Sequence, residues 1–107
     1  MSVHVLTSST FDQTLESHSI LVIDFWAEWC GPCKLFSKVM DEVAKEYPDA
    51  YFAAVNVEIE KELAEEFSVR SIPFVMIIKN RAVIYAESGA LSAMTLRELL
   101  DQAKAIK

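Results

Sequence analysis

The run Ile20-Leu21-Val22-Ile23-Asp24-Phe25 is almost entirely apolar. A strand with one face in water alternates apolar and polar residues, whereas a strand covered on both faces is apolar nearly throughout. The run therefore predicts a central strand in a sheet with helices packed on both sides. Asp24 is its one ionisable residue, and its place in the run predicts a carboxyl group inside the core.

Segments with strand-like and helix-like patterns alternate along the rest of the chain. We expect strands at 3–6, 20–25, 51–57, 74–78 and 82–86, and helices at 9–17, 33–47, 61–67 and 93–107. Ser9 and Asp12 have the spacing of a capping box for the first helix. Lys79-Asn80-Arg81 is typical of a hairpin turn. This order predicts one α/β domain over 1–107, built on a mixed five-stranded sheet flanked by four helices.

Length, composition and net charge exclude several classes of function. At 107 residues and 52% apolar, the chain can bury a core without metal or disulfide staples. The net charge of −6 argues against binding to nucleic acid or to anionic membranes. The start of the chain has no signal-peptide pattern, and the longest apolar run is far too short to span a bilayer. We therefore expect a cytoplasmic protein, in which two cysteines do not form a structural disulfide.

The motif Trp29-Cys30-Gly31-Pro32-Cys33 follows the central strand, where sheets of this type bind their ligands. Cys30 is placed at a helix N-terminus, whose unpaired N–H groups favour a thiolate. Cys33 lies about one turn further on, close enough to attack a sulfur bonded to Cys30. Pro32 suits a first helical turn, and Gly31 leaves room for an approaching substrate backbone.

Two less reactive interpretations of the cysteines remain open at this point. The pair is half of a zinc site if two more ligands are near, and only His4 and His18 are available as histidine ligands. The pair can also be purely structural. Both histidines stand near turns among polar residues, so we expect no metal.

The segment from Asp24 to Lys34 resembles the active-site segment of the thioredoxin family. The resemblance continues through 40–44, 69–73, 79–80 and 89–92, and so covers nearly the whole chain in the family's order. It implies a thioredoxin fold and thiol–disulfide exchange, with the cysteine pair in place of a cofactor. It also implies two kinds of partner, namely proteins with disulfides and a thioredoxin reductase, for a protein that we expect to be a monomer.

The resemblance also implies roles for individual residues. Cys30 would attack the substrate disulfide, and Cys33 would resolve the mixed disulfide. Asp24 would exchange a proton with Cys33 through water. Ile72-Pro73 is similar to the family's cis-proline loop, whose backbone pairs with the substrate chain. The docking surface would be completed by Trp29, Gly31, Pro32 and Gly89.

Five residues depart from the family's usual pattern: Lys38, Ala54, Phe74, Arg81 and Ser88. Lys38 stands in place of a proline, Ala54 in place of a lysine near the buried acid, and Arg81 in place of a turn glycine. We expect these departures to affect partner choice and redox tuning and to leave the exchange reaction intact.

The function most strongly implied is the reduction of protein disulfides. Two alternatives remain. One is a disulfide oxidase or isomerase, which Gly31-Pro32 between the cysteines disfavours. The other is a binding module of a larger complex in which the dithiol is idle.

Overall fold

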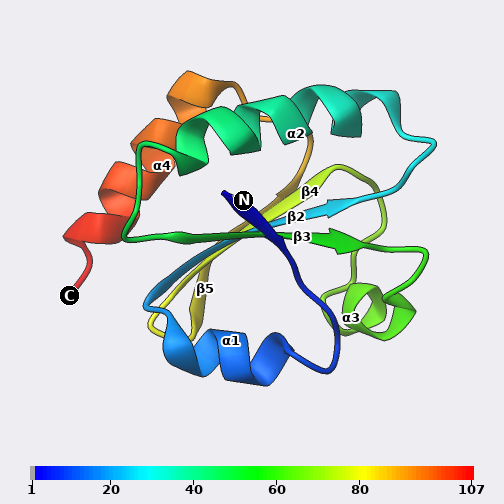
Figure 1. The fold of residues 1–107 in the computed structure, drawn as a ribbon, viewed down its shortest axis with the longest axis horizontal. Coiled ribbons are helices and arrows are strands. Elements are labelled where there is room, and N and C mark those ends of the chain that lie inside the picture. The colour runs from blue at the N-terminus through cyan, green and yellow to red at the C-terminus, as the bar shows by residue number, and fades with distance from the viewer. Residues whose placement is uncertain (1) are drawn as a thin grey trace.

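The computed structural model describes residues 2–107, which form five strands and four helices in the predicted order (Figure 1). The elements are β1 (Val3–Val5), α1 (Phe11–Ser17), β2 (Ile20–Trp26), α2 (Gly31–Ala44), β3 (Tyr51–Asn56), α3 (Lys61–Glu66), β4 (Phe74–Lys79), β5 (Ala82–Ser88) and α4 (Ala93–Ala105). Within residues 2–107, no helix is long and apolar enough to cross a membrane.

The strands form one mixed sheet in the order β1-β3-β2-β4-β5. β1, β3 and β2 run parallel, whereas β4 is antiparallel to β2 and β5 is antiparallel to β4. β2 thus has a hydrogen-bonded strand on each side, and its first six residues are buried. The all-apolar run in the sequence predicted this central position, and the prediction is confirmed.

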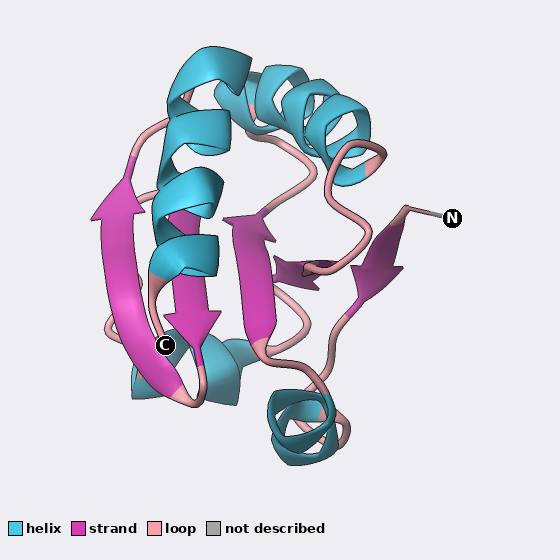
Figure 2. Ribbon diagram, turned by 90° about the vertical axis from the view of Figure 1, so that its left-hand side faces the viewer, coloured by secondary structure: helices cyan, strands magenta, loops and turns pink. Residues whose placement is uncertain are grey.

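Helices cover both faces of the sheet, as the two perpendicular views show (Figures 1 and 2). α2 and α4 pack on one face and α1 and α3 on the other. Because side chains alternate along a strand, Ile23 and Phe25 enter the core beside α1 and α3. Val22 enters the core beside α2 and α4. Asp24 faces the same way as Val22, and therefore lies under α2.

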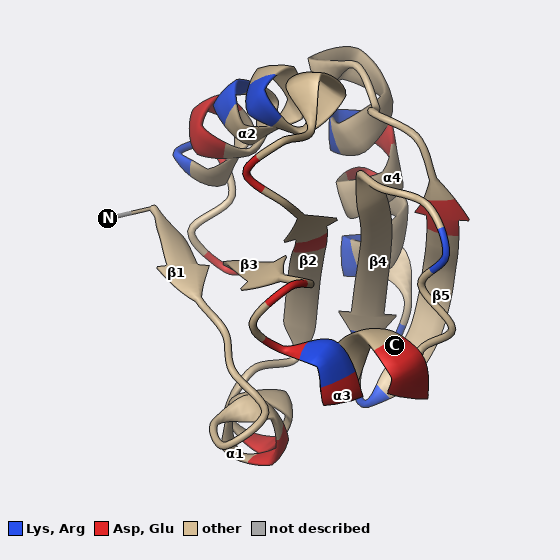
Figure 3. Cartoon of the chain, turned by 90° about the vertical axis from the view of Figure 1, so that its right-hand side faces the viewer, with Lys and Arg blue, Asp and Glu red and all other residues tan. Residues whose placement is uncertain are grey.

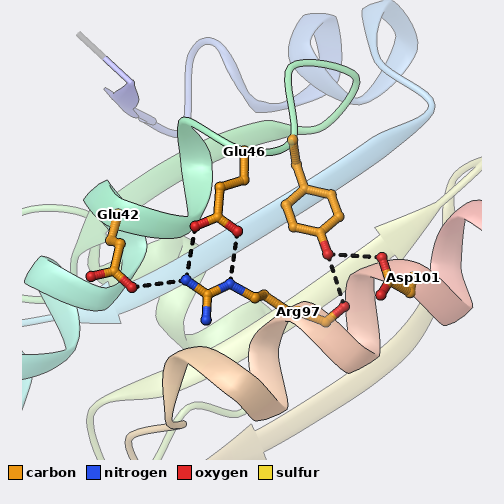
Figure 4. Close-up of polar contacts among 5 residues, drawn as sticks. Glu42, Glu46, Arg97 and Asp101 are labelled. Atoms are coloured by element: carbon orange, nitrogen blue, oxygen red, sulfur yellow. Dashed lines mark hydrogen bonds and ion pairs between the residues drawn. The ribbon is translucent and has the colours of Figure 1, made fainter.

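A polar cluster joins α2 to α4 (Figure 4). The Arg97 guanidinium donates from Nε and Nη2 to the two carboxylate oxygens of Glu46, at 2.7 and 2.8 Å, and from Nη2 to Glu42 at 2.9 Å. This hydrogen bonding lowers the pKa of Glu46 below its usual value. Tyr47 donates its hydroxyl proton to Asp101 at 2.7 Å. Exposed ion pairs add little stability, so the cluster mainly fixes how the two helices lie together.

Some predicted helix ends are wrong. Ser9 does not cap the first helix: α1 begins after Thr10, whose side chain makes no capping hydrogen bond. Instead, the Thr7 hydroxyl forms hydrogen bonds with the hydroxyls of Ser9 and Thr10, a local alternative open to such residues. α2 begins at Gly31, earlier than predicted, and ends at Ala44, before Tyr47 turns toward α4.

The hairpin between β4 and β5 has a two-residue turn. Lys79 belongs to β4 and pairs with Ala82, leaving Asn80 and Arg81 as the turn residues. Their φ angles are +50° and +71°, as a primed turn requires. Asn80 tolerates this left-handed conformation, but Arg81 carries a Cβ that is strained there.

Candidate active site

Cys30 and Cys33 form a disulfide at the N-terminus of α2, with their Cα atoms 5.2 Å apart. Cys30 is the N-cap residue, and the backbone N–H of Cys33 donates to its Sγ at 3.2 Å. The predicted proximity of the two sulfurs is therefore present. In the reduced state the same N–H group and the helix dipole would stabilise a thiolate on Cys30.

Solvent exposure does not separate the two cysteines, since Cys30 is 4% and Cys33 2% exposed. The residues around each cysteine do distinguish them. Cys30 is followed in the chain by Gly31 and Pro32, both exposed, and preceded by Trp29, which is 70% exposed. Cys33 instead lines a cavity, partly open to solvent, that it shares with Asp24. Cys30 therefore lies on the side of the exposed loop and Cys33 on the side of the cavity.

The loop before β4 approaches Cys30 from a distant part of the sequence. The carbonyl oxygen of Ile72 lies 3.9 Å from Cys30 Sγ, and the Ile72–Pro73 bond is cis, as the resemblance implied. The N–H of Gly89 donates to the Pro73 carbonyl at 2.7 Å, and its φ of +113° suits a glycine. The structure thus brings the loops carrying Cys30, Ile72 and Gly89 to one corner.

Asp24 lies in the interior, as its place in the apolar run predicted. It is 2% exposed, and its Oδ1 atom has no hydrogen-bond partner among residues 2–107. Burial disfavours the charged carboxylate and raises the pKa of Asp24 from 3.8 to about 7. Ala54 is its register neighbour on β3 and brings no charge to oppose this shift.

Asp24, Ala54 and Cys33 line a cavity of about 360 Å³ between the β1–β3–β2 side of the sheet and α2. Sequence reasoning missed this cavity, because it depends on β1 lying beside β3 and on a small residue at position 54. The departure at Ala54 was the one available signal. Its side chain leaves open the space beside the acid.

Three other residues that depart from the family's usual pattern are Phe74, Ser88 and Lys38. Phe74 packs edge-on against Phe25, with ring centroids 5.8 Å apart. Ser88 shares a hydrogen bond with Ser71 at 2.8 Å, a contact that the sequence analysis did not anticipate. Lys38 is exposed on α2.

His4 and His18 both stack on Tyr51, with ring centroids 4.4 and 4.0 Å from it. In the part of the chain that the structure describes, no three metal-ligating side chains come together.

A cysteine pair on the first turn of a helix, at the carboxyl end of a central parallel strand, defines a thiol–disulfide oxidoreductase site. The thioredoxin family model matches residues 2–102. The chain belongs to the thioredoxin family.

Similar proteins agree with this assignment. The chain is 42% identical over 99 residues to putative thioredoxin 2 of Streptomyces coelicolor, covering 92% of this chain and 74% of that protein. It is 37% identical over 99 residues to a thioredoxin of Buchnera aphidicola subsp. Acyrthosiphon pisum, covering 91% and 92% of the two chains. A solved mutant thioredoxin from Halobacterium salinarum has the same fold, with a TM-score of 0.91 at 22% identity, covering 98% of this chain and 93% of its own.

Proposed function

We propose that this oxidoreductase works as a reductant of disulfide bonds in other proteins. The observation that carries the proposal is the placement of Cys30 at the N-cap of α2, with the Ile72 carbonyl beside its sulfur. A substrate sulfur that replaces Cys33 as the partner of Cys30 would lie on this open side of the pair.

The exchange proceeds in two steps. The Cys30 thiolate attacks one sulfur of the substrate disulfide, which breaks that bond, releases one substrate thiolate and forms a mixed disulfide. The Cys33 thiol then loses its proton and attacks the Cys30 sulfur, which releases the second substrate thiolate. Two electrons pass to the substrate, and the Cys30–Cys33 disulfide is the oxidised product.

Asp24 is the proposed acceptor of the Cys33 proton. Two features support this role: Asp24 and Cys33 line one cavity, and the pKa of Asp24 is raised to about 7 by burial. A group with a pKa near the working pH can both take and return a proton. The cavity has room for water, which would carry the proton between the two side chains.

The proposed docking surface consists of Trp29, Gly31, Pro32, the Ile72–Pro73 loop and Gly89. An extended substrate segment would lie along the Ile72 backbone and hydrogen-bond to it as an added strand does. We further propose that thioredoxin reductase re-reduces the pair and that the protein acts as a monomer in the cytoplasm.

The test is the reduction of insulin disulfides, with electrons from dithiothreitol or from thioredoxin reductase and NADPH. The protein should accelerate the reaction in both assays, Cys30→Ser should abolish it, and Glu98→Gln on the exposed side of α4 should behave as wild type. An idle dithiol would give no turnover in either assay. An isomerase would instead repair scrambled disulfides better than it reduces insulin.

A further inference from the structure

The cavity beside Asp24 has the features of a small-molecule site. Its buried lining includes Asp24, Cys33 and Met40, and Ala54 forms part of its wall. At about 360 Å³ it lies within the range of volumes that hold small organic ligands. Most of its lining is apolar, so a ligand with an apolar body would be favoured over solvent.

One carboxyl group in this lining has an oxygen atom without a hydrogen-bond partner among the described residues. Asp24 Oδ1 is buried and accepts no hydrogen bond within the described residues. Ala54, its neighbour on β3, has only a methyl group to offer. A buried carboxyl group without a donor is costly, and a ligand that brings an N–H group to the part of it that lines the cavity would lower that cost.

The rim of the cavity carries more negative than positive charge. Glu28 and Asp41 contribute exposed carboxylates, and Lys34 contributes one ammonium group. Figure 3 shows one red stretch in the segment between β2 and α2, whose one acidic residue is Glu28, and a red band within β2, whose one acidic residue is Asp24. Low-dielectric walls strengthen such a field, which attracts cations and repels anions.

We propose that this cavity binds a small organic cation, namely a primary ammonium group on an apolar alkyl or aryl body. The ammonium would donate to the Asp24 carboxylate, and the apolar body would pack against Met40 and Ala54. A charge-assisted hydrogen bond of this kind is roughly twice as strong as a neutral one.

The probe is benzylammonium, with benzyl alcohol and benzoate as ligands of similar shape. Each is titrated into the oxidised, ¹⁵N-labelled full chain at about pH 8.5, above the raised pKa of Asp24. We expect amide shifts centred on Asp24 and Ala54, with benzylammonium binding about tenfold more tightly than benzyl alcohol and benzoate not binding.

Two variants distinguish binding inside the cavity from binding to the charged residues at its rim. Asp24→Asn keeps the shape and removes the charge, so benzylammonium should bind no better than benzyl alcohol. Ala54→Leu should fill the space and abolish both, with its amide spectrum showing that it folds. If that variant is unfolded, Ala54→Val makes the same test. Glu98→Gln, far from the cavity, should bind all three ligands as wild type does.

The proposal is overturned if benzylammonium has no advantage over benzyl alcohol in the wild type. It is equally overturned if benzylammonium keeps its advantage in Asp24→Asn, because the cation would then bind at Glu28 and Asp41. Amide shifts confined to residues away from the cavity would also overturn it. No disulfide exchange occurs in these titrations. Their failure would therefore leave the proposed reductase activity standing, and loss of insulin reduction would not affect this site.

Discussion

Asp24 and Ala54 are paired in register on neighbouring parallel strands, and both line the cavity that reaches Cys33. The pairing places the buried carboxyl beside a methyl group. The electrostatic state of Asp24 is therefore set mainly by its removal from water.

The first prediction concerns stability and pH. Because the folded pKa of Asp24, about 7, lies above the unfolded value of 3.8, the folded state holds the proton more tightly between these values. The free energy of unfolding should fall as pH rises from about 4 to about 7, by up to about 4 kcal/mol, and then level off. Asp24→Asn should remove this dependence and be the more stable protein at about pH 8. Denaturant titrations of both proteins across this range test it, and a stability difference that does not change with pH contradicts it.

A second prediction follows from the neighbour on β3. In Ala54→Lys, an ammonium close to Asp24 favours the carboxylate, so the pKa of Asp24 should fall below about 7. The pH window in which stability is lost should move down with it. Carboxyl chemical shifts followed by NMR give the pKa directly. Ala86→Lys, which adds the same charge on exposed β5, is the control and should leave the pKa of Asp24 unchanged.

The third prediction separates the cysteines by chemistry. In the reduced protein, one equivalent of an alkylating agent near neutral pH should label Cys30, because its sulfur is at the N-cap and receives the Cys33 N–H. Cys33→Ser should trap substrate proteins as stable mixed disulfides, since the resolving thiol is absent. Peptide mapping identifies the labelled residue. A label found mostly on Cys33 would reverse the two roles.

The fourth prediction concerns the hairpin turn. Arg81 has a φ of +71°, which glycine adopts without a Cβ clash. Arg81→Gly should raise the free energy of unfolding by somewhat under about 1 kcal/mol and leave insulin reduction unchanged. Asn80→Gly is the matched comparison and should gain less, because asparagine already tolerates this conformation. Urea midpoints test both, and an unchanged midpoint for Arg81→Gly would show that the turn carries no strain.

Much of the fold was predictable because local patterns and tertiary structure agree. The apolar run at 20–25 predicted a strand covered on both faces, and β2 is that strand. The cysteine spacing and its place after this strand predicted the active-site turn. The same run predicted that Asp24 is buried.

Other features depend on contacts that no local pattern encodes. α2 ends early, and Tyr47 then reaches Asp101, 54 positions away. The first helix lacks its expected cap because Ser9 bonds to Thr7 instead. The cavity requires β1 to lie against β3, which the order of elements alone does not specify.

The two loops that meet at Cys30 are carried by neighbouring strands of one ladder. β2 ends just before the cysteine turn, β4 begins just after Pro73, and Phe25 pairs with Phe74 across them. The spacing between Cys30 and the Ile72 carbonyl is thus set by the step of the ladder. An extra residue in the Asn80-Arg81 turn would leave that spacing untouched. One inserted between Pro73 and Phe74 would displace the carbonyl by a full strand step of about 3.4 Å. The loop before β4 should therefore tolerate insertions much less well than the turn after it.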